Sequence, residues 1–424
     1  MKIAMIGAGS TYTPELIEGL IAQHQELGIN EISLMDIDSQ KLHVVGGLVK
    51  RMLSAAGLSC TVTLTDQLDE ALIFAKYVLA QIRVGQLPAR VLDETIPLKY
   101  NLIGQETTGI GGFFNALRTI PQLLHIAHRM EALCPDAWLL NFSNPSGLLA
   151  EMLLNHTSIR TMGLCNVPIN MITDLREKLD LPCAELEFVG LNHFNWVTSI
   201  RDGNKEYLPL ALEKKLTGFQ MKNIVQTPFD YDVIKIVGAI PNAYLQYYYF
   251  REHKLASLKN EPKCRGQQCM EIEAELLKLY EDPKLCIKPA VLETRGGARY
   301  SETAVSLISA IENDKRERHV VNIRNCGAIP FMEQNDVVEI AAIVGKNGAV
   351  PIPIQSAENP HITNMLRTVK AYEKLTIEAG LEGDDNAAIN ALLLHPIIGD
   401  FSAAKACYNE MKQAHKEHLP QFFK

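Results

Sequence analysis

Short apolar runs alternate with longer segments of helical periodicity through the first 165 residues of the chain. Each apolar run has the length of a buried strand, whereas the segments between them repeat apolar residues every three to four positions. Strands that alternate with helices predict a parallel sheet with helices on both faces, here a Rossmann-type, doubly wound α/β domain. Strands are expected at 2–6, 31–35, 61–65, 77–82, 137–141 and 159–164, and helices near 13–28, 39–56, 67–75 and 113–133.

The pattern changes beyond about residue 185. An extended segment at 185–200 is followed by mainly helical periodicity at 231–256 and 267–281. We therefore expect a second lobe that is mixed α+β and largely helical, in the arrangement of lactate and malate dehydrogenases. The boundary between the two parts is placed at residue 170, which divides the chain into residues 1–170 and 171–424.

A glycine-rich turn joins the first predicted strand to the first predicted helix. Its glycines permit a tight turn and let backbone N–H groups approach a pyrophosphate at the helix N-terminus. Tyr12 occupies the position of the third glycine in the usual fingerprint, so the turn alone is a weak signal. Asp36 strengthens the signal, because an acid at the end of the second strand accepts hydrogen bonds from ribose hydroxyls and repels a 2′-phosphate. These features predict NAD binding by Gly7, Gly9, Ser10, Thr11 and Asp36.

Composition and charge argue against several classes of protein. The 424 residues are 47% hydrophobic and 21% charged, as in globular chains, and a formal net charge of −8 with no basic run disfavours nucleic acid as a partner. The first residues hold too short an apolar run for a signal peptide, and no segment approaches the ~18 apolar residues of a membrane span. Nine scattered cysteines suggest free thiols in a reducing compartment, so the expected location is the cytoplasm.

Polar residues follow the later strands, at the edge where open parallel sheets bind their ligands. Arg83 follows the fourth strand, Asn144 follows the fifth, and Cys165 with Asn166 follows the sixth. Individually, each has an ordinary explanation: a surface charge, a turn residue before proline, or a small buried side chain. None of them indicates a function by itself.

His193 lies in the segment Gly-Leu-Asn-His-Phe-Asn-Trp, near the start of the second lobe. A lone histidine is usually structural. A cysteine together with a histidine, however, offers a thiolate and an imidazole to a divalent transition metal and leaves positions open for substrate oxygens. Cys165 and His193 are therefore a candidate metal pair, although their spacing alone does not establish it.

Two further clusters occur in the second lobe. Tyr244 lies in Ile-Pro-Asn-Ala-Tyr-Leu-Gln-Tyr-Tyr-Tyr, whose helical spacing is also that of an aromatic core face. Arg295 precedes Gly296 and Gly297. Such glycines let an arginine and backbone amides approach an anion closely, but they also occur in ordinary loops.

Six segments of the chain match one enzyme family. They are GAGSTYTPEL at 7–16, GQETTGIGGFFNALRTIP at 104–121, NFSNPSG at 141–147, CNVP at 165–168, GLNHFNW at 190–196 and IPNAYLQYY at 240–248. With these segments the chain resembles glycoside hydrolase family 4 from residue 1 to beyond residue 345. The resemblance implies an enzyme that uses NAD and a divalent metal, commonly manganese, to cleave glycosidic bonds by oxidation and elimination.

The resemblance also implies a role for each candidate residue. NAD accepts a hydride from C3 of the sugar, the resulting ketone makes the C2 proton acidic, and Tyr244 removes that proton. A metal held by Cys165 and His193 stabilises the enediolate. The C1–oxygen bond then breaks by elimination, water adds, and the hydride returns to the sugar. Contacts to the phosphosugar are implied for Arg83, Asn144, Asn166 and Arg295.

Asn166 discriminates among branches of this family. Aspartate after the metal-binding cysteine is typical of 6-phospho-α-glucosidases, whereas Cys-Asn-Val-Pro is similar to the 6-phospho-β-glucosidase branch. The implied substrate is a phosphorylated disaccharide or β-glucoside, and the implied assembly is a homodimer or homotetramer. Residues 1–170 are then expected to bind NAD, and residues 171–424 to serve metal binding, substrate binding and oligomerisation.

Three other functions fit parts of the sequence. A 6-phospho-α-glucosidase or a hydrolase of unphosphorylated sugars would share every mechanistic residue. An NAD-dependent 2-hydroxy-acid dehydrogenase would share the cofactor half but needs a His-Asp proton relay, and the polar neighbours of His193 are Asn192 and Asn195. A non-catalytic NAD-binding sensor would not need Cys165, His193 and Tyr244 together.

Overall fold

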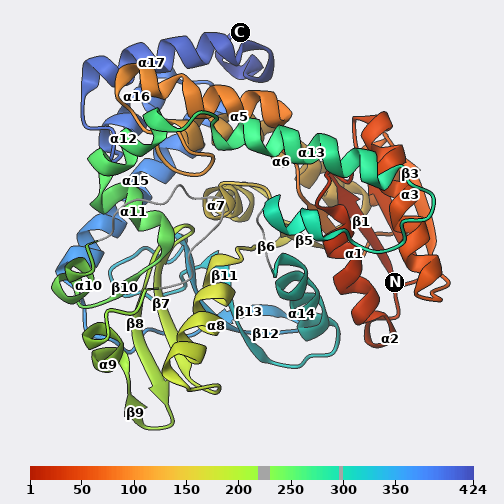
Figure 1. Ribbon diagram of the computed structural model, residues 1–424, viewed down its shortest axis with the longest axis horizontal. Helices are drawn as coiled ribbons and strands as arrows, with labels where there is room; N and C mark the ends of the chain where they lie inside the picture. Colours follow the sequence, from red (N-terminus) through yellow and green to blue (C-terminus); the bar gives the residue numbers. More distant parts are fainter. Residues whose placement is uncertain (218–229, 296–298) are drawn as a thin grey trace.

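The computed structural model describes residues 1–217, 230–295 and 299–424. Within these residues, the central sheet is built from β1 (Lys2–Ile6), β2 (Glu31–Met35), β3 (Thr61–Thr65), β4 (Tyr77–Ala80), β5 (Trp138–Asn141), β6 (Arg160–Gly163), β11 (Glu317–Arg324), β12 (Val337–Gly345) and β13 (Gly348–Pro351). The strand order is β13-β12-β11-β6-β5-β4-β1-β2-β3 (Figure 1). The strands β1 to β6 are parallel, which confirms the predicted Rossmann-type sheet.

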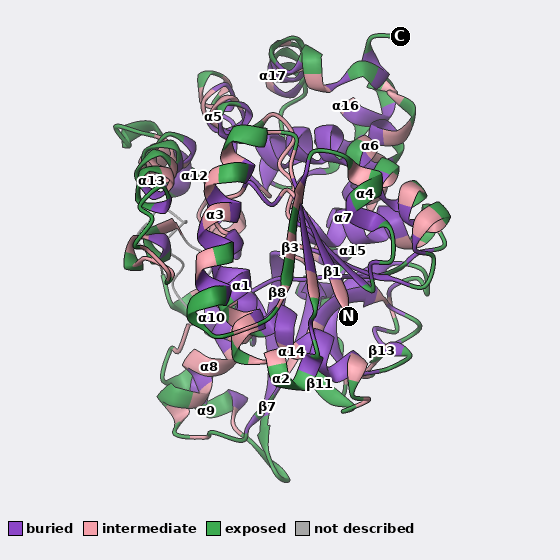
Figure 2. Ribbon diagram, turned by 90° about the vertical axis from the view of Figure 1, so that its right-hand side faces the viewer, coloured by how far each residue is buried: buried purple, intermediate pink, exposed green. Residues whose placement is uncertain are grey.

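Both faces of the inner parallel strands, such as β1, β4 and β5, are buried, which explains their nearly continuous apolar sequences. The edge strand β3 is partly exposed and carries three threonines. In β1, Ile3 and Met5 contact one layer of helices, whereas Ala4 and Ile6 contact the other. The buried strands run through the centre of Figure 2 with helices on either side. The first layer contains α1 (Thr13–Ala22), α3 (Ser39–Ala55) and α14 (Tyr300–Glu312), and the second contains α4 (Leu68–Leu72), α6 (Gly109–Leu133) and α7 (Ser146–His156).

Three antiparallel strands from late in the chain extend the sheet beyond β6. β11 pairs with β6 at Asn322 and Gly163, and β12 lies between β11 and β13. The pattern of apolar residues predicts no strands in this part of the chain. Residues 317–351 thus share a sheet with residues 2–163, and the division of the chain into two domains at residue 170 stays a prediction.

A smaller antiparallel sheet carries the turn that contains His193. Its central hairpin occupies the segment that the sequence predicts to be extended, and the turn consists of Asn192 and His193. His193 has a positive φ of 60°, which turns the chain sharply between the two strands. The strands are β7 (Glu185–Leu191), β8 (Phe194–Asp202), β9 (Lys205–Glu206) and β10 (Ile240–Pro241).

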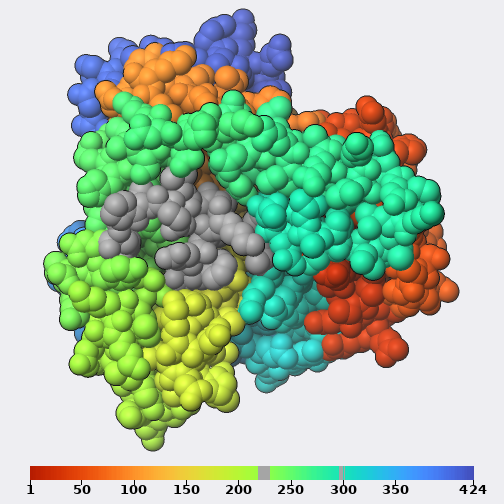
Figure 3. Space-filling model, in the orientation of Figure 1, coloured from red at the N-terminus to blue at the C-terminus, as the bar shows by residue number. Residues whose placement is uncertain are grey.

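Further helices surround these sheets. They are α2 (His24–Leu27), α5 (Gln86–Thr95), η1 (Pro97–Tyr100), α8 (Val167–Leu179), α9 (Leu208–Glu213), α10 (Asp232–Val237), η2 (Ala243–Leu245), α11 (Gln246–Tyr249), α12 (Arg251–Asn260), α13 (Arg265–Tyr280), η3 (Ala290–Arg295), α15 (Pro360–Glu382), α16 (Asp385–Leu394), α17 (Phe401–Ala414), η4 (Lys416–His418) and η5 (Pro420–Phe422). α15 packs against α6, and α13 packs against α3 and α5. Residues 251–295, which include α13, form the green and cyan band across the face shown in Figure 3. Among the described helices, none combines the length and the apolar character needed to cross a membrane.

Candidate active site

One cleft gathers most of the residues that the sequence predicts for the cofactor and the substrate. Its volume is about 900 Å³, and its walls include the residues that directly follow β1, β2, β4 and β5, where doubly wound sheets bind ligands. Cys165 and Thr11 are buried beside the cleft and do not line it. The predicted residues that line it are Gly7, Gly9, Ser10, Asp36, Arg83, Asn144, Asn166, His193, Tyr244 and Arg295.

The turn after β1 brings backbone close to the end of β2. The N–H of Gly9 donates to Oδ2 of Asp36 at 2.8 Å, and the N–H of Asp38 donates to Oδ1 at 2.9 Å. A Cβ on Gly9 would lie 2.9 Å from Cγ of Asp36, and a Cβ on Gly7 would lie 2.8 Å from the carbonyl oxygen of Gln81. At Gly7 the obstacle is backbone and φ is +85°, so only glycine fits there, whereas a side chain at Gly9 would displace the Asp36 carboxylate. A carboxylate that closes a glycine turn at the cleft wall fits the ribose and pyrophosphate of NAD.

Thr11 lies beneath this turn. Its hydroxyl contacts the guanidinium of Arg295, and its carbonyl accepts a hydrogen bond of 2.7 Å from the hydroxyl of Tyr280. Burial lowers the pKa of Arg295. Gly296 and Gly297, which the sequence places in either an anion-binding loop or an ordinary loop, lie outside the described residues. Arg295 is thereby anchored beside the cofactor turn.

A buried glutamate that the sequence analysis did not single out holds Arg83 in place. Oε2 of Glu106 lies 2.6 Å from Nη2 of Arg83 and 3.0 Å from Nη1 of Arg90. Burial by itself would raise the pKa of Glu106, but the two guanidiniums outweigh burial and lower the pKa to about 2. The side chain of Asn115 donates to the carbonyl oxygens of Glu106 and Asn144, at 3.0 Å each. Glu106 is therefore an ionised carboxylate inside the cleft.

His193 and Tyr244 are in direct contact. Their rings stack with centroids 4.0 Å apart and planes inclined by 10°. Nδ1 of His193 lies 2.9 Å from Oγ1 of Thr107. Burial lowers the pKa of His193 to about 4, so its imidazole is neutral at physiological pH. Neutral imidazole is the form that binds a metal.

Cys165 ends the loop after β6 and contacts a second buried carboxyl. Its Sγ accepts a hydrogen bond of 3.4 Å from the N–H of Val167, at the start of α8. Burial and the neighbouring Glu339 raise the pKa of the Cys165 thiol, and burial raises the pKa of Glu339 to about 7. Glu339 lies in β12 and accepts hydrogen bonds from three side-chain amides, those of Asn192, Asn195 and Asn322.

The donor set of this site fits a divalent metal with open positions. Among the residues that the structure describes, no three His, Cys, Asp or Glu side chains converge as a metal site. Cys165 offers a buried thiol and His193 a neutral imidazole, so a metal held by this predicted pair would complete its ligands with substrate oxygens or water. Oδ1 of Asn144, at the cleft wall, is buried and has no hydrogen-bond partner in the described part of the chain. An acceptor in this situation is suited to a ligand hydroxyl. The individual roles of these residues stay predictions.

Known proteins match the chain along its whole length. Residues 2–181 match the family 4 glycosyl hydrolases, and residues 188–398 match the C-terminal domain of that family. A probable 6-phospho-beta-glucosidase of Bacillus subtilis (strain 168) is 41% identical to this chain. The alignment of the two sequences is 436 residues long, gaps included, and covers 100% of this chain and 98% of the relative. A 6-phospho-beta-glucosidase of Escherichia coli (strain K12) is 38% identical, with coverage of 100% and 97%.

Solved structures agree with this match. The 6-phospho-beta glucosidase from Thermotoga maritima, determined with manganese, NAD+ and glucose-6-phosphate, has a TM-score of 0.89 at 33% identity and covers 99% of both chains. Malate dehydrogenase from Plasmodium falciparum has a TM-score of 0.53 at 11% identity, covers 90% of this chain and 98% of its own, and supports the predicted fold alone. The family predicted from the six sequence segments is thus confirmed: the chain belongs to family 4 of the glycosyl hydrolases.

Proposed function

We propose that this protein is a 6-phospho-β-glucosidase that requires NAD and a divalent metal ion, Mn²⁺ or a similar cation. The observation that carries the proposal is one cleft in which the NAD-type turn of Gly9 and Asp36 shares its walls with the stacked pair His193 and Tyr244. Relatives named 6-phospho-beta-glucosidases span the whole chain, and the Thermotoga maritima enzyme was determined with manganese, NAD+ and glucose-6-phosphate. Asn166 supports the β-specific branch over the α-specific branch.

The proposed reaction separates redox chemistry from proton transfer. When bound, NAD takes up a hydride from C3 of the sugar and later returns it, while the metal polarises the oxygens on C2 and C3. Tyr244 removes the C2 proton, which the C3 ketone has made acidic, and the C1–oxygen bond breaks by elimination. The stacked ring of His193 restricts the orientation of Tyr244. Water then adds at C1, and the proton returns to C2.

The remaining polar residues are proposed to bind the phosphosugar. Glu106 holds one side of the Arg83 guanidinium, so the other N–H groups of Arg83 are available to the substrate. The free oxygen of Asn144 is suited to accept a hydrogen bond from a sugar hydroxyl. Asn166 and Arg295 line the same cleft, and Arg295 is proposed to bind the phosphate.

We further propose a phosphorylated disaccharide or β-glucoside as the substrate, the cytoplasm as the location and a homodimer or homotetramer as the assembly. Free thiols support the location, because all nine cysteines lie in the described part of the chain and none forms a disulfide there. The division into an NAD-binding domain, residues 1–170, and a domain for metal, substrate and oligomerisation, residues 171–424, belongs to the same proposal.

The neighbours of His193 disfavour a 2-hydroxy-acid dehydrogenase. Such an enzyme needs a carboxylate on the histidine to complete the proton relay. Nδ1 of His193 instead contacts the hydroxyl of Thr107, and its ring stacks on Tyr244. The arrangement therefore suits a metal ligand beside a tyrosine base.

Hydrolysis of p-nitrophenyl β-glucoside 6-phosphate, with NAD and Mn²⁺ present, tests the proposal. Parallel reactions use the α-anomer, the unphosphorylated β-glucoside, and mixtures that lack NAD or Mn²⁺ after dialysis against a chelator. We expect turnover of the phosphorylated β-substrate alone, and loss of turnover when either cofactor is removed. Turnover without cofactors, or turnover of none of the sugars, would refute the proposed function.

A further inference from the structure

The glycine-rich segment 104–112 contains two polar residues, Gln105 and Thr107, that have no role in the proposed reaction. The glycines of this segment let the backbone of both residues pack closely against the start of α6. A Cβ on Gly112 would lie 2.3 Å from the carbonyl carbon of Thr107, and a Cβ on Gly111 would lie 2.8 Å from the carbonyl oxygen of Gln105. This close packing leaves the backbone of the segment little freedom to move beside His193.

Hydrogen-bond directions in this segment follow from one group whose role is fixed, the backbone N–H of Thr107. The backbone N–H of Thr107, which can only donate, lies 2.8 Å from Oε1 of Gln105, so an oxygen must face it. The same oxygen lies 2.8 Å from Oγ1 of Thr107, so the single hydroxyl proton of Thr107 is donated to Gln105. Oγ1 of Thr107 can then only accept from Nδ1 of His193, at 2.9 Å.

We infer that Gln105 and Thr107 are positioning residues that keep His193 as the Nδ1–H tautomer and so leave the Nε2 lone pair free for a metal. The inference rests on the proposed function, because it takes His193 to be a metal ligand. Histidines that bind metals usually donate their second N–H to a carboxylate, a carbonyl or water, which fixes the tautomer and the ring orientation. Here a threonine hydroxyl, oriented by a glutamine, supplies that acceptor.

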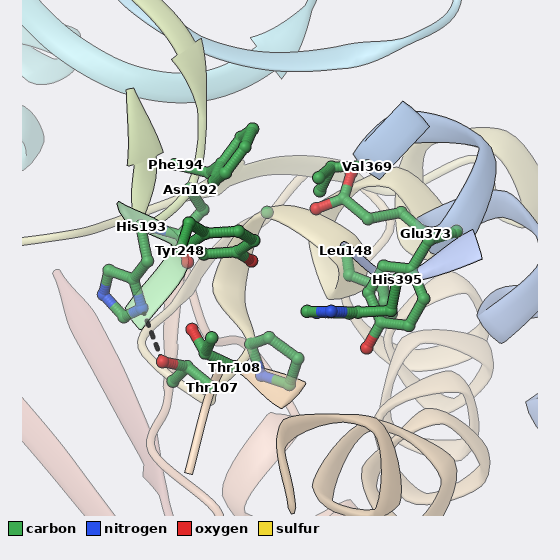
Figure 4. Close-up of a pocket in the computed structure, with 13 residues that line it drawn as sticks. Thr107, Thr108, Leu148, Asn192, His193, Phe194, Tyr248, Val369, Glu373 and His395 are labelled. Atoms are coloured by element: carbon green, nitrogen blue, oxygen red, sulfur yellow. Dashed lines mark hydrogen bonds between the residues drawn. The ribbon is translucent and has the colours of Figure 1, made fainter. Parts of the chain in front are cut away.

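Figure 4 shows the bond between His193 and Thr107 as a dashed line, with Thr108 beside it. The two threonines line the same enclosed space of about 20 Å³, but they have different partners. The hydroxyl of Thr108 contacts Tyr248, whereas the hydroxyl of Thr107 contacts His193 and Gln105. Thr108 is therefore a matched control for the same substitution one position along the chain.

Mn²⁺ affinity, followed by the electron paramagnetic resonance signal of the free ion, tests the inference on the full-length protein. Thr107→Val keeps the shape of the side chain and removes the acceptor, so we expect a loss of about 10–100-fold in Mn²⁺ affinity. Thr107→Ser and Thr108→Val should bind Mn²⁺ like the wild type. Thermal unfolding of each variant shows whether the fold is retained.

A second readout reports the tautomer itself. In metal-free protein labelled with ¹⁵N-histidine, the two ring nitrogens of His193 should appear as protonated Nδ1 and unprotonated Nε2, with the signals assigned through His193→Ala. Gln105→Met does not touch His193 but frees the Thr107 hydroxyl to rotate and donate to Nδ1. We therefore expect this variant to shift His193 toward the Nε2–H tautomer and to weaken Mn²⁺ binding.

The outcomes separate this inference from the proposed function. If His193→Ala abolishes Mn²⁺ binding but Thr107→Val and Gln105→Met bind like the wild type, the metal site stands and the inference is wrong. An Nε2–H tautomer in the metal-free wild type would also overturn it. If His193→Ala binds Mn²⁺ normally, the proposed metal site is wrong, and the inference falls with it.

Discussion

Substitution of Gly104 by alanine should displace the active-site loop by a predictable distance. A Cβ at this position would lie 1.9 Å from the carbonyl oxygen of Asp93, and real Cβ contacts stay beyond 3.0 Å, so a shift of at least about 1.1 Å is required. Asp93 cannot move away easily, because it is buried and its carboxylate accepts two hydrogen bonds from Arg118, at 2.8 and 2.6 Å. The loop with Glu106 and Thr107 must move instead. A misplacement of ~1 Å costs about 100-fold in rate, or roughly 2.7 kcal/mol of transition-state stabilisation.

The assay is kcat/KM on p-nitrophenyl β-glucoside 6-phosphate, together with the affinity for NAD. We expect Gly104→Ala to lose about 100-fold in kcat/KM and to keep its NAD affinity, because the turn at Gly9 and Asp36 lies on other elements. Gly47→Ala is the matched control: it lies within α3, and its Cβ would meet nothing closer than an atom of Arg51 at 3.4 Å. That variant should keep wild-type kcat/KM. Wild-type kcat/KM for Gly104→Ala would refute the steric argument.

Three further substitutions test separate parts of the structure. Tyr244→Phe should lower kcat by about 10²–10⁴-fold while NAD still binds, as expected when a general base is lost; unchanged kcat would show that another group removes the proton. Asp36→Ala should weaken NAD binding by about 1.5–3 kcal/mol, the value of hydrogen bonds to a charged group, and unchanged affinity in a fluorescence titration would contradict the assigned cofactor turn. Arg118→Met should lower the free energy of unfolding in urea by about 3–5 kcal/mol, because it removes the guanidinium from the buried Asp93 carboxylate and leaves His415, with Nε2 3.0 Å away, as the remaining partner. The double variant with Asp93→Leu should recover most of that loss, and no recovery would contradict an ion-pair origin.

The parallel half of the fold could be predicted because most of its strands are buried on both faces. Such strands are short apolar runs, and β1 is followed by a turn that contains Gly7 and Gly9, so both signals are local in the sequence. The strand-end residues Arg83 and Asn144 could be found for a related reason. In a parallel sheet, the ends of successive strands meet at one edge whatever the details of packing.

The extension of the central sheet by β11, β12 and β13 could not be predicted from local apolar runs. β11 joins β6 through a pairing between Asn322 and Gly163, which are far apart in the chain, and no local pattern encodes such a partner. Its sequence, Glu-Arg-His-Val-Val-Asn-Ile-Arg, mixes polar and apolar residues because only part of the strand is buried. One local signal in this part of the chain does point to the site. Glu339 is a charged residue inside the otherwise apolar run of β12.

The residues that orient the side chains of the site, Glu106 and Thr107, could not be recognised from the sequence either. Glu106 and Thr107 sit among polar residues in a glycine-rich segment, which is typical of an exposed loop. Only the fold shows that Glu106 is buried between Arg83 and Arg90, and that Thr107 meets His193. Residue types near strand ends could thus be predicted, whereas the partners that orient them depend on three-dimensional packing.

Hydrolysis in D₂O is the most direct test of the proposed elimination, because only a reaction that removes the C2 proton exchanges it with solvent. The product of the phosphorylated β-glucoside is examined by NMR for deuterium at C2, with Tyr244→Phe incubated with glucose 6-phosphate as the control for background exchange. We predict deuterium at C2 of the sugar released by the wild-type protein. A product that retains only protium at C2, formed at an undiminished rate, would contradict proton removal by Tyr244 and the NAD-dependent route to cleavage.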